Sequence, residues 1–137
     1  MAQVTISGSL SVAPATVTDS TFPAATSSVP LTTTPIPKVC AVDTGIQRGN
    51  INSPSSYAAL SGVGASPETV TQGSILYVRC AVPMLFKLAF HNPLGADDEA
   101  VIPITGTVIM EFDPSRYLTA LSVKGSGTIE WYVGGPQ

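Results

Sequence analysis

The chain has 137 residues, of which 44% are apolar and only 11% are charged, and its formal net charge is −3. This length supports one domain with its own core, and the combination of many apolar and few charged residues excludes a disordered chain. The six basic residues are scattered singly, so the chain lacks the basic cluster that binding a nucleic-acid backbone requires. A surface this weakly charged resists association poorly, which favours a surface that partner proteins cover.

Membrane insertion and secretion are not expected either. The longest apolar run, Ala81 to Phe90, is interrupted by Pro83 and Lys87 and is too short to cross a membrane. The first residues, Met1-Ala-Gln-Val-Thr-Ile, have neither the basic region nor the apolar region of a secretory signal. We therefore expect no nucleic acid and no membrane among the partners, and no export by the secretory route.

The first 37 residues differ in composition from the rest. Apolar residues near the start recur with the period of two that is typical of a strand. Five prolines between residues 14 and 37 exclude a helix and interrupt sheet pairing, which predicts an extended conformation. We expect residues 1–37 to form an extended arm with one strand, and residues 38–137 to form a separate domain.

Two interpretations of this arm are open. It is either a flexible linker that leads a first strand, or an arm that lies on a neighbouring subunit and adds its strand to that subunit's sheet. The second interpretation assigns assembly contacts to the apolar residues of the arm. The candidate assembly residues are Val4, Ile6, Leu10, Val12 and Phe22.

The remainder of the chain predicts a succession of short strands. Residues 43–67 are rich in Gly and Pro and are expected to be mostly loop, with one helical turn at 57–60. Pro83 is expected to mark a bend or an edge, residues 113–116 a turn, and residues 124–127 (Lys-Gly-Ser-Gly) a tight hairpin link. The expected strands are 39–42, 74–82, 84–90, 100–104, 107–112, 117–123 and 128–133.

Seven or eight short strands with regular turn signals and no amphipathic helix predict an all-β domain. The expected fold class is an antiparallel β-sandwich of jelly-roll or immunoglobulin-like type with an extended N-terminal arm, and a barrel is the other architecture that this pattern allows. Alternation along the strands also predicts the residues of a single core. These residues are Val78, Leu88, Val108, Leu121, Ile129 and Trp131.

The two cysteines, Cys40 and Cys80, are expected to be buried reduced thiols. A disulfide between them is the alternative, and it would require an oxidising compartment. Because no Cys-x-x-Cys motif and no second histidine are present, no metal and no cofactor is predicted.

Residues that could carry chemistry have simpler structural interpretations. His91 is the only histidine, and its place at a strand end before Asn-Pro is typical of a turn residue and not of a general base. The acidic run 97–99 could bind calcium, but it lacks the alternating spacing of an EF-hand loop and reads as a solvated loop. Residues 125–127 lack the Lys-Ser/Thr and the following helix of a phosphate loop.

Two further groups of residues also have structural interpretations. The carboxylates of Glu111, Asp113 and Glu130 could form a glycosidase pair, but they serve equally well as the polar face of a sheet. Trp131 and Tyr132 could form a sugar-binding platform, although one alternating strand points them to opposite faces. We therefore predict no catalytic residue, and expect a core tryptophan beside an exposed tyrosine.

The stretch from Asp113 to Val133, DPSRYLTALSVKGSGTIEWYV, resembles the C-terminal hairpin of small structural proteins of tailed bacteriophages. The Ala/Thr/Gly/Pro-rich, lysine-poor composition is similar as well. The resemblance implies a β-sandwich component of the virion, assembled in the host cytoplasm, that decorates or cements the capsid. Its implied partners are other copies of itself and major capsid or other virion proteins.

Two other classes of function are kept open. A carbohydrate- or receptor-binding module, such as an adhesin or tail tip, would show a cluster of exposed aromatic residues. A small enzyme would show two acids that converge in a pocket. The resemblance itself carries over no catalytic residue, so a non-enzymatic structural role is the expectation.

Overall fold

The computed structural model describes residues 2–5, 9–12, 27–30 and 38–136, and every regular element in these ranges is a β-strand. The predicted all-β class and the antiparallel pairing are therefore confirmed. The chain divides into two compact units, Gln3–Val39 and Cys40–Gln137 with Met1–Ala2. No helix in the described ranges is long and apolar enough to cross a membrane.

Two short strand pairs precede the main sheet. Strand β1 (Ala2–Val4) pairs with β4 (Lys38–Cys40), and β2 (Ser9–Val12) pairs antiparallel with β3 (Ser27–Pro30). Leu10 stands opposite Val29 in the second pair. The backbone of β2 therefore finds hydrogen-bonding partners within its own chain.

The larger unit is built from one antiparallel sheet. Its centre is β9 (Leu118–Gly135) beside β7 (Ile75–Phe90), and β8 (Asp98–Glu111) lies on the far side of β7. Strands β5 (Val42–Asp43) and β6 (Gln47–Ala59) follow one another along the other side of β9. The strand order is thus β6-β9-β7-β8, with β6 and β8 at the two edges.

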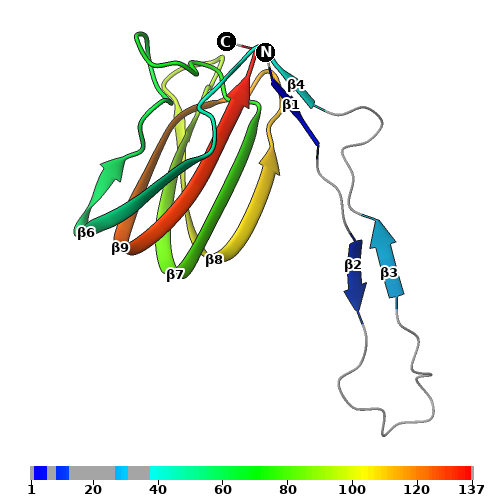
Figure 1. Ribbon diagram of the computed structural model, residues 1–137. Helices are drawn as coiled ribbons and strands as arrows, with labels where there is room; N and C mark the ends of the chain where they lie inside the picture. Colours follow the sequence, from blue (N-terminus) through cyan, green and yellow to red (C-terminus); the bar gives the residue numbers. More distant parts are fainter. Residues whose placement is uncertain (1, 6–8, 13–26, 31–37, 137) are drawn as a thin grey trace, which may run out of the picture. The chain divides into compact units, whose positions relative to one another are not determined.

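Each of the four long strands bends near its middle, so that the two halves of the sheet face each other (Figure 1). We call the half formed by residues 47–53, 75–80, 106–111 and 126–135 the Trp131 half. The Phe86 half comprises residues 58–59, 84–90, 98–104 and 118–123. The bends lie side by side because they occur at matching positions of the register.

The core lies between these two halves. Side chains alternate between the interior and solvent along β7 and β9, as period-two strands require. Five of the six predicted core residues are buried, and Val108, on the edge strand β8, is partly buried against the same cluster. Buried residues come from both halves, such as Phe86 and Leu88 in one and Ile129 and Trp131 in the other.

The predicted hairpin link at residues 124–127 is wrong, because this segment is the middle of β9. Gly127 has a positive φ of 151°, and a Cβ atom there would lie 2.5 Å from Cγ2 of Val82. Gly125 is similarly close to Met84, with 3.0 Å between the added Cβ and the Met84 Cγ. The glycines permit a tight bend of a continuous strand, which has the same local composition as a turn.

The predicted division at Pro83 is wrong for a related reason. Strand β7 continues through it, and residues 81–83 form a bulge opposite Thr105 of β8. A proline in a bulge interrupts no ladder hydrogen bond. The separately predicted strands 100–104 and 107–112 are likewise one strand, β8, and 117–123 and 128–133 together form β9.

The predicted loop over residues 43–67, with a helical turn at 57–60, is also wrong over much of its length. Residues 47–59 form β6, which pairs with β9. Residues 54–57 stand opposite Lys124 alone, so the proline and serines lie where the register shifts. The predicted strand 39–42 is divided between β4 and β5. Local composition missed β6 because its pairing depends on a strand about 80 residues away in the sequence.

Candidate assembly surface

The predicted assembly residues of the N-terminal segment fall on its strands or outside the described ranges. Val4 ends β1 and is partly exposed, and Leu10 and Val12 lie on β2. Ile6 and Phe22 lie outside the described residues. The pairing of β2 with β3 occupies one side of β2, and the role of this segment in contacting a neighbour stays a prediction.

Two long sheet edges provide the most extensive unpaired backbone of the larger unit. Within the described ranges β6 pairs only with β9, and β8 pairs only with β7. Each edge strand therefore has one side that faces no other described strand. Val101 and Ile109 on the outer face of β8 are 51% and 44% exposed. An edge of this length without a partner strand is a site where another strand can add.

The outer face of the Trp131 half is polar and connected. Tyr77 on β7 donates a hydrogen bond of 2.6 Å to Oε1 of Glu130 on β9, and Arg48 on β6 places Nε 2.5 Å from Oε2. The Tyr77 hydrogen bond and then the Arg48 bond lower the pKa of Glu130, and the same carboxylate raises the pKa of Tyr77. This network links three strands across the face and favours the ionised form of Glu130.

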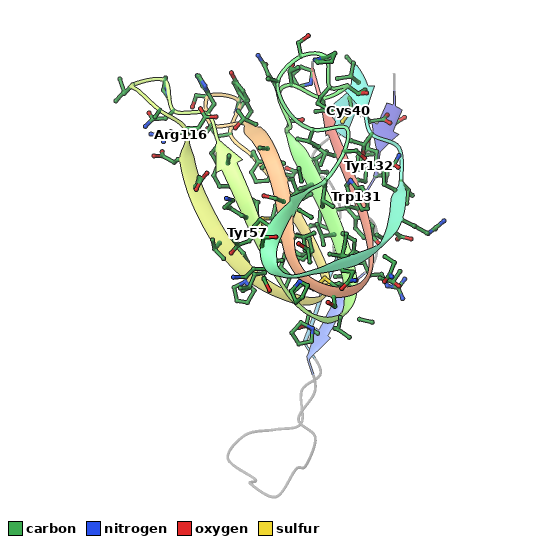
Figure 2. All side chains as sticks on the ribbon, turned by 90° about the vertical axis from the view of Figure 1, so that its left-hand side faces the viewer. Cys40, Tyr57, Arg116, Trp131 and Tyr132 are labelled. Carbon is green, nitrogen blue, oxygen red and sulfur yellow. The ribbon has the colours of Figure 1, made fainter. Side chains whose placement is uncertain are left out.

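A second cluster lies on the outer face at the bend, beside the Phe86 half. Tyr57, from the irregular part of β6, has Nζ of Lys87 at 4.8 Å and Nζ of Lys124 at 5.2 Å from its ring centroid. Figure 2 labels Tyr57 in this position. Two ammonium groups on one aromatic ring give a local positive charge on a chain whose net charge is negative.

The residues considered for catalysis or calcium binding have local structural partners. The His91 ring stacks on Tyr117 with centroids 4.6 Å apart, and its Nδ1 lies 3.9 Å from Asp97. Asp97 also accepts a hydrogen bond from the Thr119 hydroxyl. Asp98 pairs with Arg116, which Figure 2 labels, at 2.7 Å. These contacts tie the loop after β7 to the start of β9.

The three candidate glycosidase acids do not converge. Glu130, on the central strand β9, belongs to the network with Tyr77. Glu111 lies on the edge strand β8, opposite Ile75. Asp113 lies in the predicted turn, where hydrogen bonds from Ser115 lower the pKa of its carboxyl. Among the described residues no three His, Cys, Asp or Glu side chains are grouped as metal ligands.

Trp131 and Tyr132 point to opposite faces, as predicted. Trp131 is 6% exposed and packs beside Gly49, whose added Cβ would lie 3.5 Å from the indole. The expected exposure of Tyr132 is wrong, because its side chain is only partly exposed and its hydroxyl oxygen is buried. Figure 2 labels it between Cys40 and Trp131. A Cβ added at Gly134 would lie 2.8 Å from the Tyr132 hydroxyl and 2.5 Å from the Cys40 sulfur. Burial is the main cause of the raised pKa of Tyr132.

Both cysteines are buried, and no disulfide joins them. Burial raises the pKa of the Cys80 thiol, which donates a hydrogen bond of 3.3 Å to the carbonyl of Ile104. The expected buried reduced state is thus the state that the structure describes.

Sequence reasoning missed the edges and the two outer-face clusters. The clusters join residues that are far apart in the chain, such as Arg48 and Glu130, so no local sequence motif predicts them. One weak sequence signal for the edges was available, namely Pro54 and Pro103. Proline is tolerated in strands chiefly at edges and bulges, so these residues indicate edge strands.

Comparisons with known proteins identify no relative: no family model, no curated protein and no solved structure matches this chain.

Proposed function

We propose that this chain is a non-enzymatic structural protein of a tailed-bacteriophage virion, which decorates or cements the capsid through contacts between its own copies and with major capsid proteins. The observation that carries the proposal is the pair of long unpaired edges, β6 and β8, on a sheet with few charges. Such edges are a hazard for a free monomer and a means of attachment for a component of an assembly.

The two-layer arrangement of the larger unit supports a β-sandwich as its fold type. A core held between two facing halves of one sheet is compatible with a β-sandwich of jelly-roll or immunoglobulin-like type (Figure 1). Residues 1–37 would be the N-terminal arm of this domain. The resemblance of residues 113–133 to phage structural proteins is one of sequence and not of a shared hairpin, because residues 118–135 are one bent strand, and it adds the virion context. The protein would then be found on particles assembled in the host cytoplasm.

The arm proposal has a direct test. Deleting residues 1–37 is expected to leave a folded domain that no longer attaches to particles, measured by co-sedimentation with capsids of the phage that encodes it. A truncated chain that folds and attaches as well as the full chain contradicts the arm's role. A truncated chain that fails to fold shows that the first strands belong to the core.

The proposal of a structural role is tested by mass spectrometry of gradient-purified particles. The chain is expected among the virion proteins in many copies, and its absence from particles that carry all other structural proteins would overturn the proposal. His91→Ala is expected to leave attachment unchanged, because the His91 ring stacks on Tyr117 and lies near Asp97, outside the two edge strands. A loss of function by this variant at unchanged stability would reopen catalysis.

A carbohydrate- or receptor-binding module is the second candidate. The cluster of Tyr57 with Lys87 and Lys124 favours it, since an aromatic ring flanked by cations suits an acidic sugar. A glycan array probed with the full chain and with Tyr57→Ala separates the two candidates. Binding that disappears in the variant supports the module, and absence of binding to any glycan removes it.

A further inference from the structure

The two edges of the sheet are complementary in charge. Strand β8 contains three carboxylates, from Asp98, Glu99 and Glu111, and no basic residue. Strand β6 contains Arg48 as its only charged residue. Pairing β8 with β8 therefore brings like charges together, whereas pairing β6 with β8 brings opposite charges together.

We propose that copies of this chain assemble head to tail, with residues 47–53 of β6 in one copy pairing antiparallel with residues 106–111 of β8 in the next copy. This inference deepens the proposed function, because it names the contact by which copies would join, and it rests on that function only for its biological setting. It requires that backbone groups, side-chain faces and bends of the two edges fit in a single register.

The pairing of β8 with β7 determines which backbone groups of β8 point away from the sheet. The amide of Phe112 donates to the carbonyl of Ser74, and residues 112 and 74 continue the register of the β7–β8 pair. Because hydrogen bonding alternates along an antiparallel pair, the even residues of β8 face β7. The N–H and C=O groups of Thr107, Ile109 and Glu111 then point away from the sheet.

The same alternation fixes the free groups of β6. Even residues of β7 bond to β8, so its odd residues bond to the even residues of β9, and the odd residues of β9 face β6. The bond from the Thr44 amide to the Val133 carbonyl agrees with this assignment. Arg48, Asn50 and Asn52 pair with even residues of β9, so their backbone groups point outward.

One register joins these groups pairwise: Arg48 opposite Glu111, Asn50 opposite Ile109, and Asn52 opposite Thr107. All six side chains are exposed on the outer face of their strands, so a continuous sheet keeps them on one face. The Arg48 side chain is 73% exposed while its Nε bonds Glu130, which leaves the terminal guanidinium nitrogens for Glu111 of the next copy.

The inner face fits in this same register. Ile51 of β6 falls opposite Val108 of β8, and both are apolar side chains that are only partly buried against the core. Ser53 falls opposite Gly106, and the register shifts at the bends follow Ser53 in β6 and precede Gly106 in β8. Joining the edges would thus complete the burial of Ile51 and Val108 and align the bends of the two copies.

Proline confines the contact to the Trp131 half. Pro54 immediately follows the proposed segment of β6, and Pro103 lies in the Phe86 half of β8. Neither can donate a ladder hydrogen bond. The segments 47–53 and 106–111 contain no proline. A contact between different edges is heterologous, so repeated copies close into a ring or continue as a filament.

The test uses the full chain and two proline variants that each block one edge. Asn50→Pro removes an outward N–H from β6, and Ile109→Pro removes one from β8. Sedimentation velocity across a concentration series is expected to show assembly of the wild type and association weakened at least roughly tenfold in either variant. Val101→Pro is the matched control, because it changes β8 outside the proposed segment and should leave assembly intact.

Mixing the two blocked variants separates head-to-tail pairing from pairing of identical edges. Each variant retains the edge that the other lacks, so the mixture is expected to form a one-to-one dimer and nothing larger. A wild type that is monomeric throughout, a variant that self-associates as the wild type does, or a mixture that stays monomeric would overturn the inference. These outcomes do not depend on particles, so they are distinct from failure of the virion proposal.

Near-UV circular dichroism first establishes that each variant is folded. If a proline variant unfolds, Glu111→Arg replaces it, since this change sets two arginines opposite each other. It should weaken association at least roughly tenfold, while Glu99→Arg, at the same edge outside the contact, should not. Equal association of both arginine variants with the wild type contradicts the proposed register.

Discussion

The two central strands and the two edge strands pass through the same bend in different ways. Strands β7 and β9 keep one register from Ile75 opposite Gly134 to Ala89 opposite Ala120, with no shift at the bend. Strands β6 and β8 change register there relative to their neighbours. The central pair therefore defines how the sheet bends, and the edges adapt to it through bulges.

This contrast predicts different sensitivities to mutation. Buried side chains and close-packed glycines of the central strands should be costly to change, whereas the edges should tolerate changes at lower cost. Unfolding by urea, followed by tryptophan fluorescence or circular dichroism in dilute protein, measures these differences on one scale.

The largest effect is expected for Trp131→Ala on β9. The indole is buried in the core, so its removal should lower the free energy of unfolding by about 3–5 kcal/mol. Trp131→Phe is the control, and it should cost much less because the indole Nε1 is buried without a hydrogen-bond partner among the described residues. A loss below about 1 kcal/mol for Trp131→Ala would contradict the burial.

The second effect compares a central glycine with an edge glycine at the bend. Gly127→Ala should cost roughly 2–4 kcal/mol, because the new methyl meets Val82 and Met84 at a positive φ. Gly106→Ala on β8 meets nothing within 4 Å and has only its φ of 91° to overcome, so it should cost roughly 1–2 kcal/mol. Equal costs would mean that the central strands do not define the bend.

A smaller effect is expected for Ile51→Ala on the edge strand β6. Ile51 is only partly buried against the core, so its truncation should cost roughly 1–2 kcal/mol, about half of the usual cost of a buried isoleucine. The fully buried Leu88→Ala, on central β7, provides the comparison at roughly 2–5 kcal/mol. An Ile51 variant as unstable as the Leu88 variant would remove the distinction between edge and centre.

The smallest effect is the pH dependence of the Tyr77–Glu130 network. Glu130 has a lowered pKa in the folded protein, so its contribution is present above the ordinary glutamate pKa of about 4.3 and is lost as the pH falls through the lowered value. The urea midpoint of the wild type should therefore drop in this acidic range more than that of Glu130→Gln. Parallel pH profiles of the two proteins would show that the network does not stabilise the folded state.

The sequence by itself determined the all-β class and some of the residues of the core. Alternating apolar residues specify a strand with one buried face whatever its partner is, and Val78, Leu121 and Ile129 are buried as that pattern predicts. The turn at residues 113–116 was predictable as well, because Asp113 accepts a hydrogen bond from the Ser115 amide only two residues away, and turn chemistry is encoded over such short distances.

Only the tertiary structure decided which strands are continuous and where the edges lie. Gly125 and Gly127 give their segment the composition of a hairpin turn, yet they lie at the bend of one continuous strand, β9. Local sequence does not distinguish a hairpin turn from a bend of this kind. Strand β6 contains Gly49 and Pro54 and forms because β9 offers it hydrogen bonds. Strand pairing joins residues far apart in the chain, and the candidate assembly edges follow from that pairing alone.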